Sequence, residues 1–192
     1  MSMKSLIETA AGYASVSNAE ARRIISTYIQ DVQDNFTGSD KVFDNRVPGF
    51  GRWEHKAYAY KARSLLIVYT GSGIKLNFKF SRGFKNKFNA AEPLIVGNFS
   101  EKYTHDVADR VTTNRFITHR QVNDVLRGFW RAIMIEFYAP GVQKVMVRGL
   151  GTFSSKETPY SIGGKTGVSE VLRFKAFPVN FKNKKKSSYR GL

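Results

Sequence analysis

The side chains with the clearest chemical potential in this sequence are lysines and arginines along strand-like segments. Four belong to the first half of the chain and four to the second: Arg52, Lys56, Lys61, Arg63, Lys156, Lys165, Arg173 and Lys175. A further group lies near the C-terminal end: Lys182, Lys184, Lys185, Lys186 and Arg190. Such cations neutralise phosphates or pair with the carboxylates of a partner protein. A solvated strand face is an equally good interpretation of the strand residues.

The composition of the whole chain shows the same bias. Thirty-one Lys and Arg against fifteen Asp and Glu give a formal net charge of +16 and a pI near 10.1. This excess favours polyanionic partners: nucleic acid first, an acidic protein surface second, and anionic lipid a distant third.

Residues suited to catalysis or metal binding are few and scattered. His55, His105 and His119 occur in unrelated contexts, and none has a second ligand at metal-binding spacing. His105 precedes Asp106 at an apparent helix start, and His119 falls in a capping turn that we expect to be exposed. The run Gly163-Gly164-Lys165-Thr166 lacks the upstream glycine of a phosphate-binding loop. We therefore predict a protein that is not an enzyme and uses no cofactor, metal or small-molecule substrate.

Length and composition restrict the class of protein. The 192 residues, 42% hydrophobic and 14% aromatic, are sufficient for one large domain or for two domains of roughly 90 residues, with hydrophobic cores. The absence of cysteine excludes a disulfide framework and a thiolate zinc site, and it is compatible with a reducing compartment. No apolar run approaches the roughly 20 residues of a membrane span, and the N-terminus does not resemble a signal peptide. We expect no membrane partner.

A glycine motif occurs twice and organises the chain. The copies are Val47-Pro48-Gly49-Phe50-Gly51-Arg52-Trp53 and Val147-Arg148-Gly149-Leu150-Gly151-Thr152-Phe153, and 149 − 49 gives an offset of 100 positions. In each copy a strand-like run leads into a Gly-x-Gly bend, and an aromatic residue follows. The residues that define the motif are Gly49, Gly51, Trp53, Gly149, Gly151 and Phe153. Repetition of this length indicates two copies of one domain.

Two segments with helical periodicity precede each motif. They cover residues 3–11 and 18–36 in the first copy, and 103–111 and a long segment that ends before Pro140 in the second. A capping box opens each second helix, formed by Ser17 with Glu20 and by Thr118 with Gln121. The last helix is apolar over a wide arc, which predicts burial from more than one side.

A β-hairpin is predicted after each motif. In the first copy the turn is expected at Thr70-Gly71-Ser72-Gly73, between strands at 65–69 and 74–80. In the second copy a shorter hairpin is expected, with strands at 159–162 and 168–177 around a turn at 163–167. Strands are also expected just before the motifs, at 41–47 and 142–148.

These patterns divide the chain into two repeats. Both repeats close with Phe-Lys-Asn-Lys, at 84–87 and at 181–184. The expected organisation is a first repeat at 1–89, a linker at 90–101, a second repeat at 102–183 and a basic, mobile tail at 184–192.

The order of these elements resembles the HU/IHF family of bacterial DNA-bending proteins. The most specific residues are Gly149 to Phe153 and the run Phe174-Lys175-Ala176-Phe177, and the resemblance covers nearly the whole chain twice. It implies an α+β fold in which two tandem modules pair within the chain as a pseudo-dimer and share one core. It also implies that the sheet surface bearing the basic strand residues faces DNA.

The chain departs from the DNA-bending members in ways that affect its function. Neither repeat has the long arm with a Gly-Arg-Asn-Pro signature, whose proline wedges between base pairs, so DNA bending is not implied. The arrangement is similar to IHF-like proteins encoded among the tail genes of crAss-like bacteriophages, which form rings in the virion tail. We therefore predict a structural subunit of a tail or neck ring in a bacteriophage virion. Its partners would be copies of itself and other virion proteins, bound through the strands, hairpins and tail.

The alternative function is architectural DNA binding. In that case the chain would belong to the bacterial nucleoid and would contact the phosphates of duplex DNA without reading its sequence.

Overall fold

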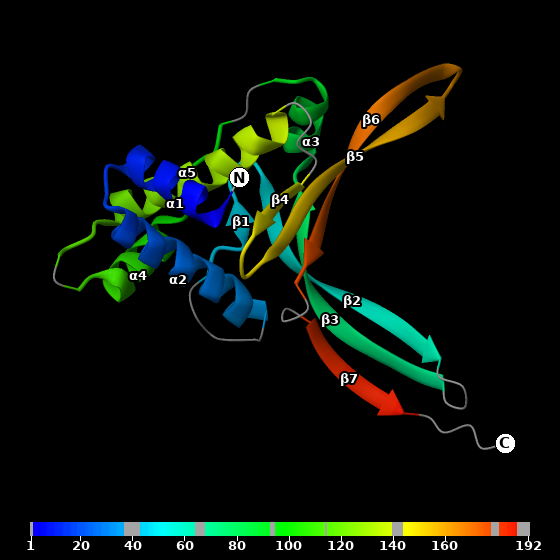
Figure 1. Ribbon diagram of the computed structural model, residues 1–192, viewed down its shortest axis with the longest axis horizontal. Helices are drawn as coiled ribbons and strands as arrows, with labels where there is room; N and C mark the ends of the chain where they lie inside the picture. Colours follow the sequence, from blue (N-terminus) through cyan, green and yellow to red (C-terminus); the bar gives the residue numbers. More distant parts are fainter. Residues whose placement is uncertain are drawn as a thin grey trace.

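The fold is α+β, with helices at one end and two projecting β-hairpins (Figure 1). A computed structural model describes residues 2–36, 43–63, 68–92, 95–113, 115–139, 144–177 and 181–187. The first half of the chain contains α1 (Met3–Ala14), α2 (Asn18–Phe36), β1 (Arg46–Val47), β2 (Gly51–Arg63), β3 (Val68–Phe80) and α3 (Arg82–Asn89). The second half contains α4 (Glu101–Val111), α5 (His119–Tyr138), β4 (Lys144–Val147), β5 (Gly151–Ile162), β6 (Lys165–Ala176) and β7 (Phe181–Ser187).

The two sheets are antiparallel and have the orders β1-β2-β3-β7 and β4-β5-β6. The strands before the motifs are shorter than expected, because residues 43–45 form no strand and β4 begins at Lys144. Residues 41–42 and 142–143 of these predicted strands lie outside the described residues.

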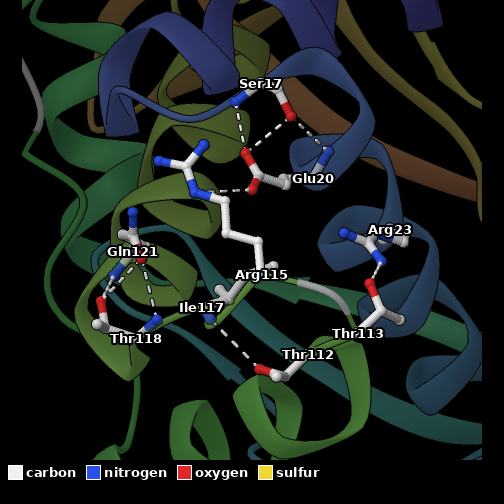
Figure 2. Close-up of polar contacts among 9 residues, drawn as sticks. All are labelled: Ser17, Glu20, Arg23, Thr112, Thr113, Arg115, Ile117, Thr118 and Gln121. Atoms are coloured by element: carbon white, nitrogen blue, oxygen red, sulfur yellow. Dashed lines mark hydrogen bonds and ion pairs between the residues drawn. The ribbon is translucent and has the colours of Figure 1, made fainter.

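Capping boxes start the second helix of each half. The hydroxyl of Ser17 accepts a hydrogen bond from the Glu20 N–H (3.2 Å), and the Glu20 carboxylate accepts from the Ser17 N–H (2.8 Å). Thr118 and Gln121 make the same reciprocal pair at 3.2 and 3.0 Å. Figure 2 shows both boxes. Each helix begins at the residue after its cap because the cap satisfies N–H groups that have no partner within the helix.

The two halves share one hydrophobic core. α1 packs mainly against α5 of the other half, and α2 packs against both α4 and α5. At the base of the sheets, the ring centroids of Trp53 and Phe174 are 5.3 Å apart, as are those of Phe78 and Phe153. Trp130 of α5 contacts Phe78 and Phe153 from the helical side, at 5.7 and 5.8 Å. The wide apolar arc of α5 is therefore buried among elements of both halves.

Both Gly-x-Gly motifs bend the chain in the same way. Gly49 and Gly149 have φ values of +84° and +88°, a region that favours glycine. At Gly51 a β-carbon would lie 2.7 Å from the Phe78 ring, and at Gly151 it would lie 2.8 Å from the Phe174 ring. The first glycine thus makes the turn, and the second lets the next strand and its aromatic side chain approach.

The first hairpin, β2 with β3, is longer than predicted and turns elsewhere. Its register runs without a break from Gly51 opposite Phe80 to Arg63 opposite Val68. The predicted turn at 70–73 was wrong, since these residues lie inside β3. Its two glycines stand opposite tyrosines of β2, Gly71 opposite Tyr60 and Gly73 opposite Tyr58. At Gly73 the aromatic side chain of Tyr58 compensates for glycine within a strand.

The second hairpin, β5 with β6, is almost as long as the first, so the prediction of a short arm was also wrong. Its register runs from Gly151 opposite Ala176 to Ile162 opposite Lys165. Only Gly163 and Gly164 form the turn, with φ values of +58° and +77°, as a two-residue hairpin turn requires. Strands of this length reach about 40 Å. We call β2–β3 the first arm and β5–β6 the second arm.

The two Phe-Lys-Asn-Lys segments fold differently. In the first half the segment belongs to helix α3, which buries Phe84 and Phe88 and is capped by the Ser81 hydroxyl. In the second half it belongs to strand β7, which pairs with β3 of the first arm. An offset of 181 − 84 = 97 places Lys185 at the position of Phe88. The second copy therefore lacks the apolar residue one turn after its phenylalanine, which a helix needs to dock on the core.

The basic run at the C-terminal end was expected to be a mobile tail, but as far as residue 187 it belongs to strand β7. β7 crosses the predicted boundary between residues 183 and 184, and its last paired residue is Ser187, opposite Tyr69. Residues 188–192, with the predicted site residue Arg190, lie outside the described part of the chain.

The predicted linker is packed against the helices where the structure describes it. Val96 and Phe99 are buried, and the Phe99 N–H donates to the side-chain oxygen of Asn123 on α5 at 3.0 Å. α4 begins at Glu101, two residues earlier than predicted, after an N-cap at Ser100. The described part of the linker from residue 95 onward is therefore packed on the second half of the chain.

Candidate interaction surface

The faces of the two sheets that point away from the helices form one candidate surface. Side chains alternate along a strand, so the neighbours of the buried Trp53, Phe78, Phe153 and Phe174 point to the opposite side. We call this side the outer face. It includes the base of both arms and continues along them as they diverge (Figure 1).

The outer face carries ten basic side chains in the described residues. Six were predicted as site residues: Arg52, Lys56, Lys156, Lys165, Arg173 and Lys175. Four were missed: Arg46, Lys75, Lys79 and Lys144. All are exposed except Lys75, which is half-buried. The wrong hairpin register concealed which residues Lys75 and Lys79 face, whereas Arg46 and Lys144 lie in the strands before the motifs.

For six other predicted site residues, the structure describes the backbone but not the side chain. The backbones of Lys61 and Arg63 lie in β2, at positions that alternate with the outer face. The backbones of Lys182, Lys184, Lys185 and Lys186 lie in β7. The side chains of these six residues are outside the described part of the structure.

Like charges stand directly opposite each other on the outer face. Arg52 lies between Arg46 and Lys79 on the neighbouring strands, and Lys56 lies opposite Lys75. Such cross-strand pairs oppose folding unless a partner compensates them. Among the described outer-face residues the one carboxylate is Glu54, which accepts from Asn77 Nδ2 at 2.9 Å.

The face of the second arm that lies opposite the outer face carries two facing carboxylates. Glu157 stands opposite Glu170, and Glu170 Oε2 is buried without a hydrogen-bond partner in the described structure. Two carboxylates in register repel each other, so this face is suited to a cationic partner.

The free edge of the second arm is contacted at one place by α3. The side-chain oxygen of Asn89 accepts from the Glu170 N–H at 3.0 Å and from the Ser169 hydroxyl at 3.4 Å. Because residue 170 directs its N–H away from β5, residues 166 and 168 of β6 do the same. No described strand pairs with this edge. In the first arm the corresponding edge of β3 is paired with β7.

Large apolar side chains are exposed near the tip of the second arm. Ile162 is 75% exposed and Val168 is 64% exposed, and Tyr160 and Val171 are also exposed. Projecting apolar residues next to an open strand edge are a feature of surfaces that other chains cover.

The histidines differ from the sequence-based expectation, and His119, expected to be exposed, is half-buried. His105 lies inside α4, and its ring stacks on that of His119 at the start of α5, with centroids 4.0 Å apart. Their contexts are therefore not unrelated. No group of three or more His, Cys, Asp or Glu that could hold a metal ion occurs among the described residues.

Comparison with known proteins assigns the chain to no family. It matches no protein-family model, no curated protein and no solved structure. Within the described residues, no helix has the length and apolar character needed to cross a membrane. A functional proposal therefore depends on the outer face and the two arms.

Proposed function

We propose that this chain is a structural subunit of a bacteriophage virion, an HU/IHF-fold protein of a tail or neck ring that acts without catalysis. The observation that carries the proposal is the difference between the two arms. The edge of the first arm is paired by β7, whereas the equivalent edge of the second arm has no strand partner among the described residues. A neighbouring subunit would supply that partner.

The fold supports the HU/IHF part of the proposal. Two helix–helix–sheet halves with the same Gly-x-Gly bend share one core, and each half extends a hairpin arm. This is the arrangement that the sequence resemblance implies for a fused pseudo-dimer.

The chemistry of the second arm supports assembly through it. Near the tip, β6 directs outward backbone groups that no described strand pairs, beside the exposed Ile162 and Val168. Addition of a strand at such an edge is a common way to join chains. A contact between two different surfaces of identical subunits produces a ring when the rotation closes. The lysine-rich strand β7 is itself an edge, and its composition suits the Glu157–Glu170 face of a neighbour.

Architectural DNA binding is the second candidate, and the outer face favours it. Ten basic side chains with one carboxylate among the described residues form a surface suited to phosphates. The long second arm also removes one objection, since a short arm could not follow a groove.

The mass of the purified protein, with and without a 30-base-pair duplex across a salt titration, separates the two candidates. The structural proposal expects a discrete oligomer whose mass does not depend on DNA. A monomer that binds the duplex, with affinity falling steeply as salt rises, would contradict it and support the second candidate.

A substitution in the edge of β6 tests whether this edge forms the contact between subunits. Val168→Pro removes an N–H that points away from β5, so it blocks strand addition while leaving the β5–β6 ladder intact. We expect Val168→Pro to reduce the oligomer to smaller species. Val168→Thr keeps both the N–H and the β-branched shape, and it should assemble like the original chain. Equal assembly of the two variants would exclude the β6 edge as the contact.

A further inference from the structure

An ion pair between the buried Asp31 and the half-buried Arg110 joins the two halves on one side of the helical core. Asp31 of α2 is 1% exposed. Its carboxylate accepts hydrogen bonds from Arg110 Nη1 and Nη2 of α4 at 2.8 and 2.7 Å, and from the Tyr103 hydroxyl at 2.8 Å. Arg110 also pairs with Asp106, at 2.7 Å. Every partner of Asp31 named here belongs to the second half of the chain.

Burial and the contacts with Asp31 also keep Tyr103 and Arg110 protonated. Burial raises the pKa of the Tyr103 hydroxyl, and the neighbouring Asp31 carboxylate raises it further. Hydrogen bonding to Asp31 raises the pKa of Arg110. Both groups therefore remain donors to Asp31 over the whole physiological pH range.

The two halves also meet on the other side of the core, and there the residues equivalent to Asp31 and Arg110 are uncharged. The caps are offset by 118 − 17 = 101, which makes Ala132 the counterpart of Asp31. The buried faces of α1 and α4 are offset by 103 − 6 = 97, which makes Tyr13 the counterpart of Arg110.

Tyr13 packs against a glycine and two arginines of α5. A β-carbon on Gly128 would lie 2.8 Å from Tyr13 Cβ, so glycine is needed for this approach. The guanidinium groups of Arg127 and Arg131 lie over the Tyr13 ring, 5.8 and 5.5 Å from its centroid. By the same offset of 101, the counterpart of Gly128 in α2 is Thr27.

We infer that the cluster of Asp31, Arg110 and Tyr103, together with the Tyr13–Gly128 contact on the other side, makes each half accept only the other half as its partner. Two first halves would bury Asp31 without a cation and place Tyr13 against Thr27. Two second halves would place Arg110 beside Ala132 and leave it only Asp106 of its own helix as a carboxylate partner. A buried carboxylate without a cation is strongly unfavourable, and two second halves lose the ion pair with Asp31, so both pairings between identical halves are less stable than the pairing of different halves.

This inference concerns an interface that the proposed ring contacts do not use. The partner it specifies is the complementary half, either of the same chain or of a second copy. It predicts that changing the charges can redirect pairing from within one chain to between two chains.

Charge reversal within one chain is the first test. Asp31→Arg and Arg110→Asp should each lower Tm by roughly 10 °C, because each brings two like charges together at the buried position 31. The double variant Asp31→Arg/Arg110→Asp restores an opposite pair and should recover most of the loss. No recovery in the double variant would show that the pair has only a local packing role.

Pairing between chains is the second test, and it does not require either single variant to fold alone. A chain with Asp31→Arg is co-refolded with a chain carrying Arg110→Asp. The first half of each chain then matches only the second half of the other. The expected product is an exchanged dimer of the two chains.

Cross-linking detects this dimer independently of any ring. Arg23 Nη1 of the first half donates to Thr113 Oγ1 of the second half at 2.5 Å (Figure 2). Because the chain has no cysteine, Arg23→Cys in the Asp31→Arg chain and Thr113→Cys in the Arg110→Asp chain give unique attachment sites for a short bis-maleimide. A two-chain product on a denaturing gel reports the exchange.

The control is the same pair of cysteine chains with Asp31 and Arg110 unchanged. These chains should pair internally, so they should give little two-chain product. A yield at least tenfold higher from the charge-reversed pair supports the inference. Equal yields would overturn it, whether or not the protein forms rings.

Discussion

At the scale of single residues, Glu20 and Gln121 show how equivalent caps acquire different properties. Both side chains accept the N–H of their cap residue, but only Glu20 is charged. Hydrogen bonds from the Ser17 backbone and then from its hydroxyl lower the pKa of Glu20, and Arg115 and Arg23 contribute, while burial opposes them. Arg115 Nε lies 3.7 Å from the Glu20 carboxylate, in the contact that Figure 2 shows.

This pKa shift predicts a pH dependence of folding stability. A carboxyl with a lowered pKa stabilises the fold above its ordinary value of 4.5, and that contribution is lost as pH falls through the lower folded value. Glu20→Gln can still cap the helix, as Gln121 does, but it has no charge to lose. Urea unfolding between pH 7 and pH 3 should therefore show a shallower loss of stability in the variant.

Glu8→Gln is the matched control for this measurement. Glu8 is exposed and pairs only weakly with Lys4, 3.8 Å away. The control should follow the pH profile of the original chain. Parallel profiles for Glu20→Gln and the original chain would show that the Glu20 charge does not contribute.

At the scale of elements, the closing segments show how one short sequence can form a helix or a strand. α3 touches the second arm through Asn89, and β7 pairs with the first arm, so each segment crosses to the arm of the other half. In α3 two phenylalanines anchor the helix, whereas β7 has one phenylalanine and obtains its stability from the ladder with β3. The result is one covered arm edge and one largely free edge.

Removal of β7 should expose the edge of the first arm. In a chain ending at residue 180, the β3 amides that point toward β7 lose their partners between residues 69 and 75. We expect them to exchange with solvent at least about tenfold faster, because local opening then requires fewer broken hydrogen bonds. Hydrogen exchange of β6 serves as the internal control and should stay unchanged. Unaltered protection of β3 would show that β7 does not stabilise the first arm.

At the scale of the whole molecule, we expect polyanion binding to depend more on the distribution of the basic side chains than on the net charge. The ten outer-face cations come from six strands, and the fold brings them to one side. Clustered cations raise the local potential, so they bind polyanions more strongly than the same number dispersed over the surface.

A comparison of two variants with equal net charge tests this distribution. The first replaces four outer-face residues with Gln: Arg52, Lys79, Arg173 and Lys175. The second replaces four exposed lysines on helices with Gln: Lys4, Lys85, Lys87 and Lys102. The outer-face variant should elute from a heparin column at clearly lower salt than the helix variant, because polyanion binding depends on the number of contacted cations. Elution at the same salt would show that net charge alone controls binding.

The sequence by itself determined the features that depend on neighbouring residues. The two Gly-x-Gly bends, the capping boxes at Ser17 and Thr118, and the extent of α2 follow from local conformation and short-range periodicity. Six of the ten outer-face cations were among the residues that the sequence analysis named as site residues.

Only the tertiary structure decided the features that depend on distant residues. Gly71 and Gly73 read as a turn in isolation, but pairing with Tyr60 and Tyr58 makes them part of a strand. The strand register also decides which lysines share the outer face, and burial of Phe88 decides between a helix and a strand for the closing segment. In each case two local conformations are close in free energy, and contacts with residues far away in the sequence select one of them.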